Sequence, residues 1–150
     1  MRLQKNTLLA LYSVLEFAAN PERQVAASEI ARKYRVSPHH LAKVLRTLGR
    51  ARLVGAVRGV GGGYRFAGNA KRLTLMDVIE LFEEISAPRR APAKGARRRT
   101  EAGASAAPHE VEEALGVVLA EIDEIAKATF RSITLATMLK LVERRRSRAG

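Results

Sequence analysis

The sequence predicts a mainly α-helical fold with one small β-hairpin, and three observations lead to this expectation. Apolar residues recur at spacings of three and four along most of the 150-residue chain. Two short runs rich in β-branched and aromatic residues break this pattern on either side of a glycine cluster at 59–63. A segment rich in alanine, arginine and proline has no period at all. We therefore expect a folded domain over residues 1–85, a flexible basic linker over 86–109 and a helical part over 110–150.

The first part of the chain predicts three helices. The first helix has apolar residues at helical spacing and ends before Asn20 and Pro21; these apolar residues are Leu8, Leu11, Tyr12, Leu15 and Ala18. Ser28 is the expected cap of a short second helix. Ser37 and Pro38 should begin a third helix that continues to about Arg52, because serine can cap the first turn and proline needs no amide partner there. The expected buried stripe of the third helix is Leu41, Val44, Leu45 and Leu48.

A hairpin and a fourth helix follow. Residues 53–57 and 64–67 are the expected strands, and the glycines between them form the turn. Thr74 and Asp77 resemble a capping box with a shorter acid, which predicts the start of a helix. The inward residues of that helix would be Val78, Ile79, Phe82 and Ile85.

The last part of the chain predicts a long helix with an apolar seam. The seam residues are spaced four, three, four and three, which is typical of a helix that packs lengthwise on another helix; they are Val111, Leu115, Val118, Ile122 and Ile125. Val117 and Leu119 widen this seam. Two heptads are few for a coiled coil, so an ordinary core helix remains an alternative. A final helix should start near Thr134, continue to about Val142 and lead into a basic tail at 144–148.

The glycine cluster does not have the spacing of a nucleotide-binding loop. In the pattern GxGxxG the third glycine is replaced by Tyr64 or Phe66, no Gly-Lys-Ser/Thr follows, and the next segment resembles a strand rather than a helix. Two helices joined by a tight turn and followed by a hairpin form a winged helix-turn-helix. In that fold the second helix enters the major groove, and an arginine at the hairpin tip, here Arg58, can enter a narrowed minor groove.

The charge distribution agrees with a nucleic-acid partner. The chain has 27 Lys and Arg against 15 Asp and Glu, a formal net charge of +12. Residues 23–72 contain twelve of these cations and a single acid, Glu29, whereas residues 110–150 contain seven charges of each sign. The excess therefore lies in the helix-turn-helix and hairpin, and we expect double-stranded DNA as the partner. A protein that coats nucleic acid nonspecifically is the alternative.

Catalysis, metal binding and membrane insertion have little support in the sequence. The absence of cysteine excludes thiol nucleophiles and cysteine-ligated metals, and the three histidines lack a nucleophile or carboxylate at triad-like positions. Glu80, Glu83 and Glu84 should lie on the outward face of their helix. No apolar run approaches the ~18–20 residues that span a bilayer, and no secretory signal is present. We expect a cytoplasmic protein that is not an enzyme, with no cofactor and no membrane partner.

The residues around the third helix and the hairpin resemble the Rrf2 family of bacterial transcriptional regulators. The resemblance rests on the runs 36–41 (VSPHHL), 57–59 (VRG), 61–64 (GGGY) and 74–79 (TLMDVI). It implies a homodimer joined through the long helix, with the last helix packing onto the partner subunit. We predict a sequence-specific regulator, a repressor, that acts on a palindromic operator.

Carried over residue by residue, the resemblance places Ser37, His39 and His40 at the start of the recognition helix, where family members touch bases and phosphates. Arg58 matches the wing arginine of the minor groove. Charge alone assigns phosphate contacts to Lys43, Arg46 and Arg50. The remaining expected DNA contacts are Gly59, Gly61, Gly62 and Tyr64. Each histidine could instead be an exposed helix-start residue without a base contact.

The chain departs from the family pattern in the loop before the long helix. Cluster-sensing members of the family hold an iron–sulfur cluster there with three cysteines, and this chain has none. Six cations occupy the loop instead, at positions 89, 90, 94 and 97–99, and His109 alone makes no metal site. The loop is either a further DNA-contacting arm or a solvated linker. An unknown small-molecule effector, a protein effector and constitutive DNA binding all stay open.

Overall fold

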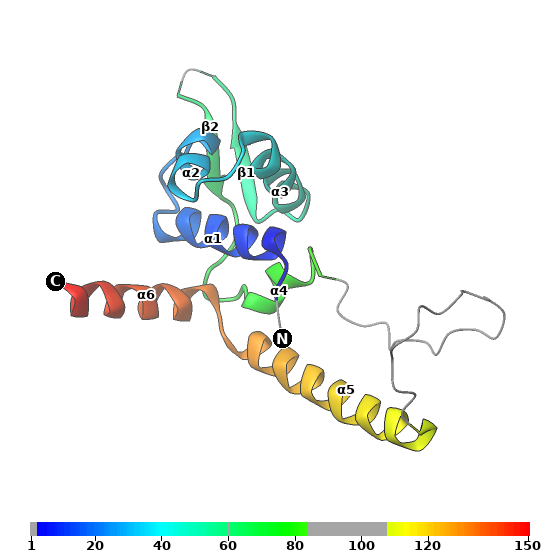
Figure 1. Cartoon of the computed structure of the whole chain (residues 1–150). Helices are drawn as coiled ribbons and strands as arrows, with labels where there is room; N and C mark the ends of the chain where they lie inside the picture. The colour runs from blue at the N-terminus through cyan, green and yellow to red at the C-terminus, as the bar shows by residue number, and fades with distance from the viewer. Residues whose placement is uncertain (1–2, 60, 84–107) are drawn as a thin grey trace.

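The computed structural model describes residues 3–59, 61–83 and 108–150 and confirms the predicted fold class (Figure 1). Six helices and a two-stranded antiparallel hairpin are found in these residues: α1 (Lys5–Ala19), α2 (Ala27–Lys33), α3 (Pro38–Arg50), β1 (Val54–Val57), β2 (Gly63–Phe66), α4 (Leu75–Ile79), α5 (His109–Ser132) and α6 (Leu135–Ala149). Glu84, Ile85 and most of the expected linker, including its six cations, lie outside the described residues. Pro108 and His109 belong to the start of α5.

Helix α1 crosses the centre of the domain, and its buried face includes residues beyond the predicted apolar pattern. Leu9, Val14 and Phe17 are buried in the core, whereas Tyr12 is 43% exposed and lies outside the buried face. Of the apolar residues at helical spacing, Leu11 and Ala18 are also buried, so the amphipathic pattern holds except at Tyr12. Apolar residues surround most of this helix, so their spacing alone does not identify the face that packs.

A distant carboxylate caps the first turn of α1. Gln4 precedes the helix but makes no side-chain cap. Instead, the Glu83 carboxylate accepts hydrogen bonds from the Gln4 amide (2.7 Å) and from the Thr7 hydroxyl (2.5 Å). Glu83 is therefore not simply an outward charge, because it fastens the end of the α4 segment to α1.

The helix-turn-helix forms largely as predicted, with one correction at α2. The residue before α2 is Ala26, and Ser28 lies inside the helix, so the predicted Ser28 cap is wrong. The entry into α2 is set by Val25, whose amide and carbonyl pair with the Tyr64 backbone (2.8 and 2.9 Å). In α3 the predicted cap is confirmed, because the Ser37 hydroxyl accepts from the His40 amide at 3.1 Å.

The expected stripe of α3 is confirmed as core. Leu41, Leu45 and Leu48 are fully buried, and Val44 is 2% exposed. The helix ends at Arg50 rather than near the expected Arg52, which adopts a left-handed conformation (φ 60°). This conformation stops the helix and turns the chain into β1.

The segment between the hairpin and α4 joins the domain to the two C-terminal helices. Thr74 and Asp77 form the predicted capping box of α4, and Thr74 makes an isolated antiparallel bridge with Thr134, the cap of α6. Leu135 is fully buried, so the first turn of α6 packs on the protein's own core. Figure 1 shows α5 extending away from the domain from this junction.

Candidate nucleic-acid interface

The outward face of α3 is a continuous row of cationic and histidine side chains. His39, Lys43, Arg46 and Arg50 are all exposed and follow one another at spacings of four, three and four, so they share one face of the helix. The leucine stripe holds the opposite face in the core, which orients this row toward solvent. The helix contains no acidic residue. It therefore presents a surface that complements a phosphate backbone.

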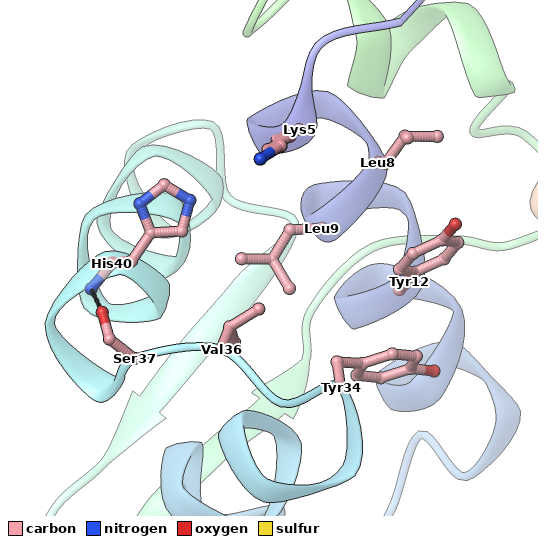
Figure 2. A pocket seen from close by; sticks show the side chains of 8 residues that line it. All are labelled: Lys5, Leu8, Leu9, Tyr12, Tyr34, Val36, Ser37 and His40. Carbon is pink, nitrogen blue, oxygen red and sulfur yellow. Dashed lines mark hydrogen bonds between the residues drawn. The ribbon is translucent and has the colours of Figure 1, made fainter.

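His39 and His40 occupy different environments although they are neighbours in sequence. His39 is exposed on the outward row. His40 is half-buried and faces α1, where it lines a pocket together with Lys5 and Ser37 (Figure 2). The first turn of α3 thus has one histidine on the outer surface and one behind it.

The hairpin loop projects beyond α2 and α3 (Figure 1), with Arg58 exposed directly after β1. Gly59 and Gly61 have φ of 113° and 75°, a region that favours glycine. At Gly62 an added Cβ would lie 2.6 Å from the Val57 carbonyl oxygen. The glycine cluster therefore serves the conformation of the turn, which is closed by a hydrogen bond from the Gly62 amide to the Gly59 carbonyl (2.9 Å).

Tyr64 lies away from the outward surface. Its ring is half-buried, packs against the core and approaches the Phe17 ring at 6.3 Å, while its backbone pairs with Val25. The structure thus separates Tyr64 from the other expected DNA contacts and uses it to hold the hairpin on α1.

Two exposed arginines of this region were not predicted. Arg65 lies on the hairpin face opposite Tyr64 and pairs in register with Gly55. Strand alternation after Tyr64 could have identified it. Arg35 lies in the turn before α3 with a positive φ of 53°, a conformation that no local sequence signal indicated.

The predicted apolar seam of α5 is exposed. Its five residues, Val111, Leu115, Val118, Ile122 and Ile125, are 52–61% exposed, and Val117 and Leu119 beside it are also exposed. The alternative of an ordinary core helix is therefore wrong, because the core formed by the described residues does not cover this face. An exposed apolar stripe of this length is typical of a protein–protein contact.

A family model described as an iron-dependent transcriptional regulator, Rrf2, matches residues 3–141. The chain belongs to the Rrf2 family. It is 51% identical to the HTH-type transcriptional regulator BadM of Rhodopseudomonas palustris over 152 aligned residues, which cover 100% of this chain and 90% of BadM. The predicted resemblance and the winged helix-turn-helix are confirmed, and the protein is a DNA-binding regulator of transcription.

The solved structures that share this fold include those of CymR and IscR. CymR, the global cysteine regulator of B. subtilis, superposes with a TM-score of 0.67 at 21% identity, covering 94% of this chain and 98% of CymR. IscR of T. potens superposes with a TM-score of 0.60 at 23% identity, covering 95% of this chain and 88% of IscR.

The iron in the family description has no matching ligand set here. The whole chain lacks cysteine, and the residues that the structure describes contain no group of three His, Asp or Glu side chains placed to hold a metal ion. The donors therefore do not fit a cluster or an iron site of this family. In the part of the chain that the structure describes, every helix is too short or too polar to span a bilayer.

Proposed function

We propose that the protein is a homodimeric repressor that recognises a palindromic operator in a sequence-specific manner. The observation that carries the proposal is the acid-free cationic face of α3, which lies beside a projecting glycine loop. In winged-helix proteins these two elements enter adjacent grooves of one duplex.

The placement of the side chains suggests how contacts divide between bases and backbone. Ser37 and His39, in the first turn of α3, would approach base edges, because the start of a recognition helix points into the major groove. The cations farther along the outward row would contact phosphates and fix the register. These cations are Lys43, Arg46 and Arg50.

The hairpin would supply a second contact. Arg58 would enter the minor groove, and the open space around Gly59 and Gly61 would allow the backbone to approach the duplex closely. Gly62 would hold the turn. Tyr64 would contribute indirectly, by fixing the hairpin on α1. Arg65 extends the cationic surface along the hairpin and is a further candidate phosphate contact.

The exposed seam of α5 supports the homodimer. A second copy of the same helix offers a matching apolar stripe, and a twofold axis would pair each seam with its counterpart. Two recognition helices related by this axis would read half-sites about 34–36 Å apart, one turn of B-DNA. A palindromic operator follows from that symmetry. Repression then requires only that the dimer occupy promoter DNA.

Selection of duplexes from a random library, followed by competition, tests this proposal. We expect an enriched palindrome, and its shuffled form should compete at least tenfold less well. Arg46→Ala should weaken binding, whereas Arg144→Ala, an exposed arginine of α6 far from α3, serves as a matched control. If the shuffled duplex competes as well as the palindrome, the chain coats nucleic acid nonspecifically and the proposal fails.

A further inference from the structure

An apolar pocket lies directly behind the first turn of α3. Its volume is about 440 Å³, which is in the range of small-molecule sites. Figure 2 shows Leu9 and Val36 at its centre, contributed by α1 and by the turn before α3. Tyr12 and Tyr34 form one side and stack on each other with ring centroids 5.1 Å apart. The walls are thus mainly hydrocarbon and aromatic.

The tyrosine wall is held rigidly from outside the pocket. The Tyr34 hydroxyl donates a hydrogen bond to the Glu16 carboxylate at 2.6 Å, and Lys33 pairs with the same carboxylate. Burial and this hydrogen bond raise the pKa of Tyr34. The hydroxyl is therefore occupied by Glu16, and the two rings are left to line the cavity.

Positive charge is found at the opposite side of the pocket. Figure 2 shows the Lys5 amine and the His40 ring on the side away from the tyrosines. None of the eight lining residues is acidic, and Lys5 makes no ion pair with any residue that the structure describes. An anionic group that entered here would meet a cation without a competing carboxylate.

The same pocket adjoins the proposed DNA interface at the start of α3, where Ser37 belongs to both. Ser37 and His40 line it, and they are also joined by the hydrogen bond that caps α3. A molecule in the pocket would therefore touch the first turn of the recognition helix from behind. A bound molecule changes DNA affinity only if its contacts with this turn differ between the free protein and the DNA-bound protein.

We propose that this pocket binds a small organic anion with an apolar body, and that the bound anion lowers the affinity for DNA. The coupling half of the proposal rests on the DNA interface proposed above. The apolar body lies between Leu9 and the tyrosine rings, and the anionic group pairs with Lys5 and accepts a hydrogen bond from His40. DNA binding weakens because the ligand holds the turn at Ser37 and His40, which caps α3, in the free-state position and adds a negative charge behind the helix that meets the phosphates.

Two fluorescent probes with the same apolar body test the binding half without DNA. We expect 8-anilinonaphthalene-1-sulfonate to bind the full-length protein more tightly than N-phenyl-1-naphthylamine, which lacks the sulfonate. Lys5→Gln should weaken the sulfonate probe about fivefold, the loss of roughly one partly exposed ion pair, and leave the neutral probe unchanged. Lys71→Gln removes an exposed lysine that does not line the pocket and is the matched control.

Leu8→Trp separates this pocket from other apolar surfaces such as the α5 seam. Leu8 is a half-buried lining residue, so the larger ring should fill the cavity, weaken both probes and abolish the tighter binding of the sulfonate probe. Leu141→Trp adds the same ring at an exposed site on α6 and should have no effect. If the sulfonate probe binds Lys5→Gln and Leu8→Trp as it binds the wild type, it sits elsewhere and the proposal is overturned.

To test the coupling half, the affinity of the protein for the palindrome enriched in the selection is measured with and without a saturating concentration of the sulfonate probe. We expect the probe to weaken operator binding at least fivefold in the wild type and not at all in Leu8→Trp. Equal operator affinity with and without the probe, in a protein whose pocket is occupied, would overturn the coupling. A protein that binds no duplex at all would refute the proposed function instead, whereas the probe titration would still decide the pocket.

Discussion

The exposed seam of α5 allows a quantitative prediction about the stability of the proposed dimer. Val118 and Ile122 lie at its centre and are each 52% exposed. Replacing both by glutamate should convert the dimer to a monomer, because each partner helix would lose apolar contacts and would bury carboxylates against a matching apolar stripe.

The magnitude follows from the exposed fraction. Complete burial of a Val or Ile side chain stabilises by about 1.5–3 kcal/mol, so the exposed half of each contributes about 1 kcal/mol when a partner covers it. Two residues in each of two subunits give about 4 kcal/mol, which raises the dimer dissociation constant about 1000-fold. The uncompensated carboxylates add to this loss.

Sedimentation equilibrium at several protein concentrations measures the effect. Gly116→Glu with Ala120→Glu is the matched control: both residues are exposed on the other side of α5, and their Cβ positions are open or solvent-facing. The control should remain dimeric, while Val118→Glu with Ile122→Glu should be monomeric and should bind a single half-site only weakly. A double variant that sediments like the wild type would refute the assignment of the seam to the dimer contact.

Three further predictions concern the hairpin and the α1–α2 contact. Arg58→Ala should weaken operator binding about five- to tenfold, about 1–1.4 kcal/mol, and most on sites with A·T-rich flanks, measured by fluorescence anisotropy; equal loss on G·C-rich flanks would contradict a minor-groove contact. Gly62→Ala should reduce DNA affinity because its Cβ would clash with the Val57 carbonyl, whereas Gly55→Ala, with no atom within 4 Å, should keep the hairpin intact. Glu16→Gln should lower the unfolding free energy at pH 7 by about 1 kcal/mol. Although burial opposes the charged form, hydrogen bonds from Lys33 and Tyr34 lower the pKa of Glu16. Its stabilisation is therefore present above the unfolded pKa of ~4.3 and lost as pH falls through the folded value, so urea titrations of the two proteins should converge in acid.

Local signals predicted the parts of the fold that local chemistry determines. The Ser37 cap, the capping box at Thr74 and the α3 stripe each depend on residues within one or two turns, and all three are found. The start of α2 could not be predicted in this way. It is set by the bridge between Val25 and Tyr64, residues far apart in sequence whose pairing depends on the hairpin packing against α1.

The same distinction applies to the candidate site. Charge and the resemblance led to the outward row of α3, but they did not separate His39 from His40, because both begin one capped helix. The position of α1 behind that helix decides which imidazole faces solvent and which faces Lys5. The cap of α1 by Glu83 is likewise a contact across the fold, and no spacing in the sequence indicates it.

The junction between the domain and the C-terminal helices determines whether the proposed dimer can measure a half-site spacing. A fixed distance between two recognition helices requires that α5 cannot swing relative to α3. The backbone supplies this stiffness where α4 and α6 begin: the Leu75 amide donates to the Ile133 carbonyl (2.9 Å), and the Leu135 amide donates to the Leu73 carbonyl (2.8 Å). Because these two bonds cross-link the segment after the hairpin to the turn after α5, bending at this point would break both. We therefore expect the seam and the reading helix to move as one unit in each subunit of the proposed dimer, so that the operator spacing would follow from the dimer axis rather than from DNA-induced adjustment.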